Sequence, residues 1–195
     1  MSEILFIRHG PTEWNQDGKI QGRTDIPLSD DGKREVRSWQ LADRFHSWSC
    51  FCSPLKRARQ TASLLGLPDP TLIDALLEME WGEWEGHTLE SLRAIDPMAF
   101  RRNEDRGLDF RPPGGESPRD VRDRLSIWLS HLQADSLPAV VVCHKGVIRA
   151  AHSLATDWDM TDDPPQKLRD SCAHLYELKS GALRARELNI PLRMS

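Results

Sequence analysis

The chain has 195 residues and a formal net charge of −4, and hydrophobic residues make up 38% of it, with seven Trp and five Phe. This length and aromatic content favour one folded domain and exclude a disordered or fibrous chain. The acidic balance argues against broad nucleic-acid binding, and the first apolar run, residues 4–7, is too short for a signal peptide or a membrane span. We therefore expect a cytoplasmic protein without nucleic-acid or membrane partners.

Two continuous apolar segments predict central strands. Residues 4–7 (ILFI) are followed by a break at Gly10 and Pro11, and residues 139–143 (AVVVC) stop at His144. Runs of this kind are typical of strands that are covered on both faces, as in a parallel sheet. A third, shorter strand is predicted over residues 50–52.

Helix signals lie between these strands. Ser29 is a candidate N-cap, and Val36, Trp39, Ala42 and Phe45 recur at three-residue spacing, which predicts one amphipathic helix from Ser29 through Phe45. Another helix is predicted to begin near Arg57, directly after the short strand.

A turn at residues 112–115 (PPGG) precedes a third helix signal. Ser117, Pro118 and Asp120 supply a cap, a first-turn proline and an acidic third position, and apolar residues continue to Leu132. Residues 173–178 and 183–188 flank Ser180–Gly181 and predict a terminal hairpin, and residues 162–165 predict a surface loop. Alternation of strands and helices predicts an α/β fold with a mostly parallel sheet.

Four cysteines are too few for a disulfide framework in a chain of this length. Cys50 and Cys52 have the spacing of a ligand pair, but no second pair stands at zinc-site spacing. Buried thiols are therefore the favoured interpretation.

Each long apolar strand ends in a histidine. His9 follows the first strand and His144 follows the later one, and ligands of open α/β sheets bind at the carboxyl ends of strands. The two imidazoles converge on one cleft if the strands are neighbours. The alternative is two unrelated histidines.

Arginines beside these histidines point to phosphate. Arg8 precedes His9, and Arg57 stands at the start of a predicted helix. A guanidinium matches phosphate oxygens with paired hydrogen bonds, and clustered arginines lower the pKa of a nearby histidine, which leaves it neutral and nucleophilic.

Six segments together resemble the histidine phosphatase superfamily, the phosphoglycerate-mutase-like proteins, and are closest in pattern to its compact phosphatases. In chain order they are FIRHGPTEWN (6–15), QGRTDIPLS (21–29), SPLKRARQTA (53–62), LEMEWGEWEG (77–86), GGES (114–117) and VCHKG (142–146). The resemblance implies a single domain over residues 1–195. Its expected fold is a three-layer α/β/α sandwich with a mostly parallel sheet, an antiparallel edge strand and a small helical cap insertion around residues 88–116.

The resemblance also implies residue roles. His9 would attack phosphorus, while Arg8, Arg57 and His144 would bind the phosphoryl oxygens without a metal or another cofactor. Glu78 would protonate the leaving oxygen and then activate water.

Further residues would complete a substrate pocket. Asn15, Gly22 and Arg23 are the expected phosphate-binding residues. Lys145, a further candidate for substrate binding, stands where many members have a small residue, and it either adds positive charge beside the pocket or faces solvent. Pro11 stands where the common signature has Glu, which puts the geometry of this loop in doubt.

Sequence leaves some of these choices open. Glu80 and Glu83 compete with Glu78 for the role of the acid, with Glu78 favoured by motif position. Trp81 and Trp84 either exclude water from that acid or serve ordinary core packing.

The favoured function is hydrolysis of a small phosphorylated metabolite through a phosphohistidine on His9. The alternatives are a cofactor-dependent phosphoglycerate mutase, a domain that only binds phosphorylated ligands, and a zinc hydrolase that uses both histidines and a carboxylate. The resemblance permits sugar phosphates, phosphoglycerates, α-ribazole phosphate or broad specificity. Residues 100–111 are assigned to the cap, where their arginines either contact a second anionic group of the substrate or pair with neighbouring acids. A homodimer is left open.

Overall fold

The computed structural model describes residues 2–67 and 69–192. Within them, six strands form one sheet in the order β3-β2-β4-β1-β5-β6. The strands are β1 (Glu3–Arg8), β2 (Ser49–Cys52), β3 (Thr71–Leu72), β4 (Ala139–Cys143), β5 (Cys172–Lys179) and β6 (Ala182–Pro191). Strands β1 to β4 run parallel to one another, while β5 runs antiparallel to β1 and pairs with β6 in the predicted hairpin.

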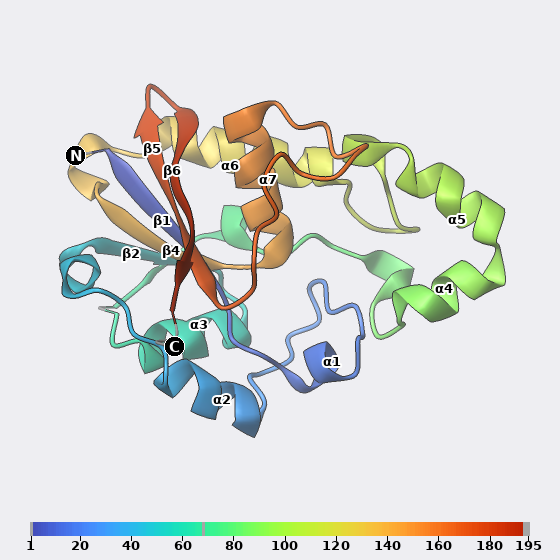
Figure 1. The fold of residues 1–195 in the computed structure, drawn as a ribbon, viewed down its shortest axis with the longest axis horizontal. Helices are drawn as coiled ribbons and strands as arrows, with labels where there is room; N and C mark the ends of the chain where they lie inside the picture. Colours follow the sequence, from blue (N-terminus) through green and yellow to red (C-terminus); the bar gives the residue numbers. More distant parts are fainter. Residues whose placement is uncertain (1, 68, 193–195) are drawn as a thin grey trace.

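Helices cover both faces of this sheet, as Figure 1 shows. Helices α2 (Asp30–Arg37) and α3 (Lys56–Leu64) lie on one side of the strands, and α6 (Pro118–His131) and α7 (Lys145–Thr156) lie on the other. Side chains of β1 alternate between the two faces, with Leu5 and Ile7 in one buried cluster and Ile4 and Phe6 in the other. The predicted three-layer α/β/α class is therefore confirmed.

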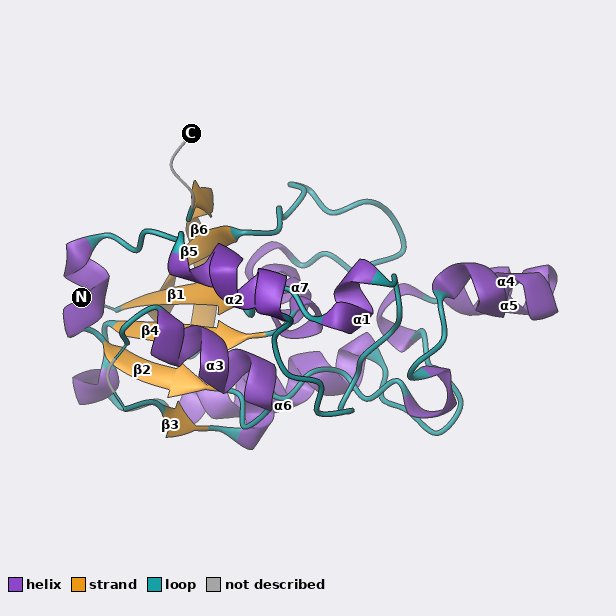
Figure 2. Ribbon diagram, turned by 90° about the horizontal axis from the view of Figure 1, so that it is seen from below, coloured by secondary structure: helices purple, strands orange, loops and turns teal. Residues whose placement is uncertain are grey.

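Two helices lie apart from these layers. Helices α4 (Leu89–Ile95) and α5 (Pro97–Glu104) fall within the segment predicted as an insertion and extend away from the sheet in both ribbon views (Figures 1 and 2). We call them the α4–α5 arm. In the part of the chain that the structure describes, no helix combines the length and the apolar character needed to cross a membrane.

Short elements connect the layers. They are α1 (Glu13–Gln16) and the 3₁₀ segments η1 (Asp43–Ser47), η2 (Asp74–Leu76), η3 (Gly82–Trp84), η4 (Gly107–Asp109) and η5 (Ala134–Ser136). The α6 start signal is confirmed, because Ser117 and Asp120 form a capping box and Pro118 occupies the first turn.

The helix predicted from Ser29 through Phe45 is shorter than expected. Ser29 caps α2, but the helix ends at Arg37, where the Ser38 hydroxyl and backbone N–H both donate to the Glu35 carbonyl. The next turn does not form, since the Gln40 N–H donates to the Leu192 carbonyl at 2.6 Å. Phe45 is buried within η1 instead. Three-residue spacing fits a helix followed by a 3₁₀ turn as well as it fits one longer helix.

The four cysteines are free thiols. Cys50 and Cys52 both lie in the buried cluster beneath α2 and α3, and burial raises the pKa of these thiols to about 11 and about 12 respectively. Thiols of this kind stay protonated, which supports the interpretation of Cys50 and Cys52 as core residues.

Candidate active site

The two histidines predicted to converge do so. Strands β1 and β4 are parallel neighbours, with Ile7 opposite Val142, and the His9 N–H donates to the Cys143 carbonyl at 3.0 Å. Both strands therefore end at the same edge of the sheet. The ring centroids of His9 and His144 lie 5.1 Å apart.

His9 is a neutral imidazole with a defined tautomer. Its side chain is only 6% exposed, and Nδ1 lies 2.7 Å from the Gly10 carbonyl. Because a carbonyl oxygen only accepts, Nδ1 carries the proton and Nε2 keeps its lone pair. Burial, followed by the charges of Arg8 and Arg57, holds the pKa of His9 well below its usual value.

Arg57 is fully buried on α3, and it bonds to groups on separate segments. Its Nη1 donates to the Thr24 carbonyl at 2.9 Å, its Nη2 donates to the Gly22 carbonyl at 2.6 Å, and its Nε donates to His144 Nδ1 at 3.3 Å. A guanidinium has five N–H groups, so one on each terminal nitrogen remains for an anion. Arg57 also lines the cavity described below.

His144 is held on both sides of its ring. Because Nδ1 accepts from Arg57, the proton of the neutral ring lies on Nε2, which donates to the Ser53 hydroxyl at 2.7 Å. Burial, followed by the charge of Arg57, holds the pKa of His144 well below its usual value. Sequence reasoning did not identify Ser53, although its place directly after the β2 strand was a usable signal.

The loop of residues 22–24 is held from two sides. Its carbonyl groups accept from Arg57, and the N–H groups of Arg23 and Thr24 donate to the Glu85 carboxylate, each at 2.8 Å. Glu85 also accepts from the Thr24 hydroxyl and, at 3.2 Å, from the Trp81 N–H.

Glycine is required at position 22 of this loop. Gly22 has a φ of +52°, and a Cβ at this position would lie 1.8 Å from Glu85 Oε1. Sequence reasoning missed Glu85, although it lies within the recognised segment 77–86.

Arg23 does not join the other predicted binding residues. Its guanidinium donates to Glu116 at 2.9 Å and lies 3.6 Å from Glu80, and its side chain is not part of the lining of the cavity. Glu116 accepts in addition from Arg124, which also donates to the Ala75 and Leu77 carbonyls. The Arg23 side chain therefore contacts Glu80 and Glu116, while Arg124 holds the chain before Glu78. The expected contact of Arg23 with phosphate stays a prediction without support from its placement.

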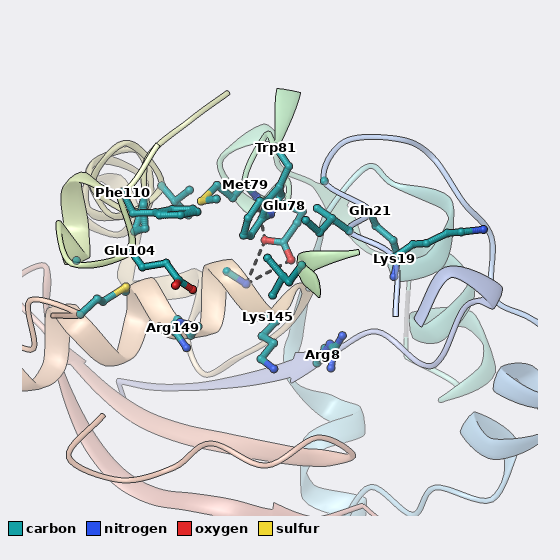
Figure 3. A pocket seen from close by; sticks show the side chains of 18 of the residues that line it. Arg8, Lys19, Gln21, Glu78, Met79, Trp81, Glu104, Phe110, Lys145 and Arg149 are labelled. Atoms are coloured by element: carbon teal, nitrogen blue, oxygen red, sulfur yellow. Dashed lines mark hydrogen bonds between the residues drawn. The ribbon is translucent and has the colours of Figure 1, made fainter. Parts of the chain in front are cut away.

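The structure separates the three competing carboxylates. Glu78 lines the cavity, where its Oε1 accepts from the Met79 N–H at 2.8 Å and from the Gly146 N–H at 3.1 Å (Figure 3). A Cβ on Gly146 would lie 2.3 Å from Glu78 Oε1, so glycine is needed there for close approach. Glu80 contacts Arg23, and Glu83 is exposed.

A cavity of about 650 Å³ connects these groups. Its lining includes most of the predicted site residues: Arg8, His9, Asn15, Gly22, Arg57, Glu78 and Lys145. His144 is not part of this lining, and both of its ring nitrogens already have partners, so its expected contact with the phosphoryl oxygens stays a prediction. Oδ1 of Asn15 accepts from the Thr12 backbone and hydroxyl, each at 3.1 Å, which leaves the amide NH₂ for a ligand. Trp81 lines the cavity, whereas Trp84 stacks on Phe100 with ring centroids 4.9 Å apart.

The Arg8 guanidinium is paired at one nitrogen and unpaired at another. One terminal nitrogen forms an ion pair with Asp170, and its buried Nε has no partner among the described residues. Burial would raise the pKa of the Asp170 carboxyl, but the Arg8 guanidinium outweighs this effect and holds that pKa below its usual range. Sequence reasoning gave no indication of Asp170.

The site therefore combines a neutral imidazole with a free Nε2, two arginines, a carboxylate and a helix start at Lys145. An oxygen-rich dianion is the ligand that such a set of donors and positive charges favours. No three His, Cys, Asp or Glu side chains within residues 2–67 and 69–192 group together in a way that could hold a metal ion.

Comparisons with known proteins agree with this chemistry. The model of the histidine phosphatase superfamily (branch 1) matches residues 4–191. The uncharacterized phosphatase PhoE of Bacillus subtilis is 31% identical over 100% of this chain and 98% of its own. The probable phosphoglycerate mutase GpmB of Salmonella choleraesuis is 33% identical over 67% of this chain and 62% of its own.

A solved structure has the same fold along nearly the whole chain. The crystal structure of TTHB049 from Thermus thermophilus superposes with a TM-score of 0.74 at 32% identity, covering 96% of this chain and 99% of that one.

Proposed function

The chain belongs to the histidine phosphatase superfamily (branch 1), and from this premise we propose that it hydrolyses a small phosphomonoester through a phosphohistidine on His9, without a metal. One observation carries the proposal. His9 is buried and neutral, with its proton on Nδ1, and the charges of Arg8 and Arg57 act on it. This arrangement presents a lone pair on Nε2 where a phosphoryl group would be bound.

In the first step, Nε2 of His9 attacks phosphorus. The N–P bond forms, the bond from phosphorus to the ester oxygen breaks, and Glu78 in its carboxylic acid form gives its proton to the departing alkoxide. The remaining N–H groups of Arg57, the buried Nε of Arg8 and the Asn15 amide would bind the phosphoryl oxygens. The resulting imidazolium keeps its Nδ1–H bond to the Gly10 carbonyl.

In the second step, water replaces the imidazole. Glu78, now a carboxylate, takes a proton from water as its oxygen bonds to phosphorus, and the N–P bond breaks. Inorganic phosphate leaves, and His9 and Glu78 return to their starting forms. The N–H groups of Met79 and Gly146 hold the Glu78 carboxylate in position for both transfers.

Hydrolysis is favoured over mutase activity by the extent of similarity. The chain covers nearly all of the Bacillus phosphatase but only 62% of the Salmonella mutase. A mutase must shield its phosphoenzyme from water until the product is rephosphorylated, and added segments serve that purpose. The similarity to GpmB keeps phosphoglycerate mutase as the second candidate.

The test uses p-nitrophenyl phosphate in excess EDTA. We expect turnover in EDTA, an acid-labile phosphoenzyme, and loss of both in His9→Ala, with a rate at least about 10³-fold lower. His46→Ala, which changes an exposed histidine, is the control. Full activity of His9→Ala would contradict the mechanism, and activity lost in EDTA but restored by zinc would support the zinc hydrolase. Binding of phosphate without turnover would support a binding-only domain.

A second assay separates phosphatase from mutase. With 3-phosphoglycerate we expect release of inorganic phosphate, whether or not 2,3-bisphosphoglycerate is present. Interconversion of 2- and 3-phosphoglycerate that depends on the bisphosphate would favour the mutase instead.

A further inference from the structure

Besides Arg8, Lys19 and Arg57, the cavity is lined by cations from the α4–α5 arm and from helix α7. On the α4–α5 arm, Arg93 forms an ion pair with Glu104, and Arg101 forms one with Asp105 at 2.8 Å. The positive charges that this arm brings to the cavity are therefore balanced by its own acids. The sequence left open whether the arginines of this region meet the substrate or neighbouring acids, and for Arg101 the structure shows an acid partner.

Helix α7 carries two cations of the lining that form no ion pair among the described residues. Lys145 and Arg149 stand four residues apart on α7, which places them on the same face of the helix. Among the described residues, neither has a carboxylate within ion-pair distance. The Arg149 guanidinium lies over the Trp158 ring, 4.8 Å from its centroid, so the ring supports one face while the edge N–H groups stay available.

Burial is consistent with a site prepared for an anion. Arg149 is half-buried, and burial lowers the pKa of its guanidinium, an effect that Glu78 partly opposes. A cation held out of water in this way is costly unless an anion joins it. Glu78 is the one acid whose charge acts on Arg149 in this way, and its carboxylate is bonded to backbone N–H groups instead.

These cations also border a second cavity. Arg8, Lys145 and Arg149 line both the main cavity and a neighbouring one of about 410 Å³. In Figure 3 their side chains follow one another along one wall of the pocket, opposite Phe110 and Trp81. Asp170 forms an ion pair with Arg8, and its charge also acts on Lys145 from a greater distance. Neither Lys145 nor Arg149 has an ion-pair partner among the described residues, so both can contact a ligand.

We propose that Lys145 and Arg149 bind a second anionic group of the substrate, a carboxylate or a second phosphate, while the group to be transferred lies at His9. This inference rests on the proposed function and narrows it to phosphomonoesters that carry a second negative charge. A cavity of about 650 Å³ has room for such a molecule. Phosphomonoesters whose remainder is neutral leave the two cations unpaired and bind more weakly.

The first test needs no variant. The pair 3-phosphoglycerate and glycerol 3-phosphate differs by a carboxylate in place of a neutral CH₂OH, and 1,3-propanediol bisphosphate and monophosphate form the matching pair for a second phosphate. We expect kcat/KM to favour the doubly anionic member of at least one pair by about tenfold or more, mainly through KM. The pair that shows the preference identifies the second group. Ratios below about twofold in both pairs overturn the proposal.

Variants then assign the preference to residues. Lys145→Gln and Arg149→Gln should each bring the ratio toward one, with the larger loss for Arg149→Gln because its charge is more buried. Arg101→Gln is the matched control, since it removes a cavity-lining arginine that has an acid partner, and it should keep the wild-type ratio. If Arg149→Gln fails to fold, the substrate ratio of Lys145→Gln, which changes an exposed side chain, still tests the proposal.

Two outcomes contradict the assignment. If Lys145→Gln or Arg149→Gln slows turnover of both members of a pair equally, the residue supports turnover in general and does not bind the second anionic group. A shifted pH profile with an unchanged ratio means that Arg149 acts on Glu78 and not on the substrate. Absence of His9-dependent turnover of p-nitrophenyl phosphate would contradict the proposed function itself. Normal turnover with equal rates within each substrate pair would contradict only this inference.

Discussion

A single hydroxyl group fixes the second histidine of the site. His144 has two ring nitrogens, and Nδ1 accepts from Arg57, so the neutral ring carries its proton on Nε2, and this buried N–H needs an acceptor. Ser53 supplies that acceptor at 2.7 Å in a fully buried place. Ser53 is thus a positioning residue for the imidazole that lies beside His9.

Loss of the Ser53 hydroxyl should lower both the stability of the fold and the rate of turnover. In Ser53→Ala, the Nε2–H of His144 is buried without a partner, and we expect unfolding free energy to fall by about 1–3 kcal/mol. Because the ring is then free to rotate away from Arg57, kcat for p-nitrophenyl phosphate should fall about tenfold or more. Urea unfolding and steady-state kinetics measure both, with Ser130→Ala on the exposed surface as the control. An unchanged kcat, alongside the lost stability, would mean that Ser53 is structural only.

At the scale of elements, the cavity beside His9 depends on a loop that has no regular structure. Residues 22–24 are held because Glu85 accepts their N–H groups while Arg57 donates to their carbonyls. Glu85 lies directly after η3, so the loop is tied to the same segment that leads from Glu78. A shift of this loop would therefore move both Arg57, which donates to its carbonyl groups, and the segment that carries Glu78.

Substitution of Glu85 tests this coupling. In Glu85→Gln, an amide NH₂ would face the Arg23 or Thr24 N–H, so at least one hydrogen bond is lost and the loop loosens. We expect kcat/KM for p-nitrophenyl phosphate to fall about tenfold and unfolding free energy to fall by about 1–3 kcal/mol. Glu83→Gln, an exposed carboxylate in the same segment, is the matched control and should change neither. Equal behaviour of the two variants would show that the loop is held without Glu85.

At the scale of the whole molecule, buried histidines make the fold sensitive to acid. His9, His144 and His174 are at most 6% exposed. Burial holds the pKa of His9 and His144 well below the usual value, and burial together with His152 lowers the pKa of His174 to about 4. Between pH 6.5 and about 4 the unfolded chain therefore binds more protons than the folded one, and stability falls as pH falls.

We expect the free energy of unfolding to drop by at least about 2 kcal/mol between pH 7 and pH 5, since one such histidine alone contributes about that much. Urea unfolding at several pH values measures it. His174→Gln should make the dependence shallower, whereas His46→Gln, at an exposed position, should leave it unchanged. A stability that stays flat from pH 7 to pH 5 would contradict the neutral state assigned to these histidines.

Local signals in the sequence were sufficient for most of the fold. The apolar runs at residues 4–7 and 139–143, the capping box at Ser117 and the terminal hairpin all appear where predicted, because their patterns depend on neighbours along the chain. The helix from Ser29 was overextended because its end depends on a bond from Gln40 to Leu192, at the other end of the chain.

The sequence by itself determined the α/β class, the family and most of the predicted residues that line the cavity, since strand ends and motif order are local properties. Tertiary structure decided which of these groups meet. It placed Glu78, but neither Glu80 nor Glu83, in the lining of the cavity, turned Arg23 toward Glu116, and brought Ser53, Glu85, Arg149 and Asp170 beside the predicted residues. Each of these choices depends on contacts between segments far apart in the chain, where burial and the need to pair every polar group leave one arrangement that no local pattern records.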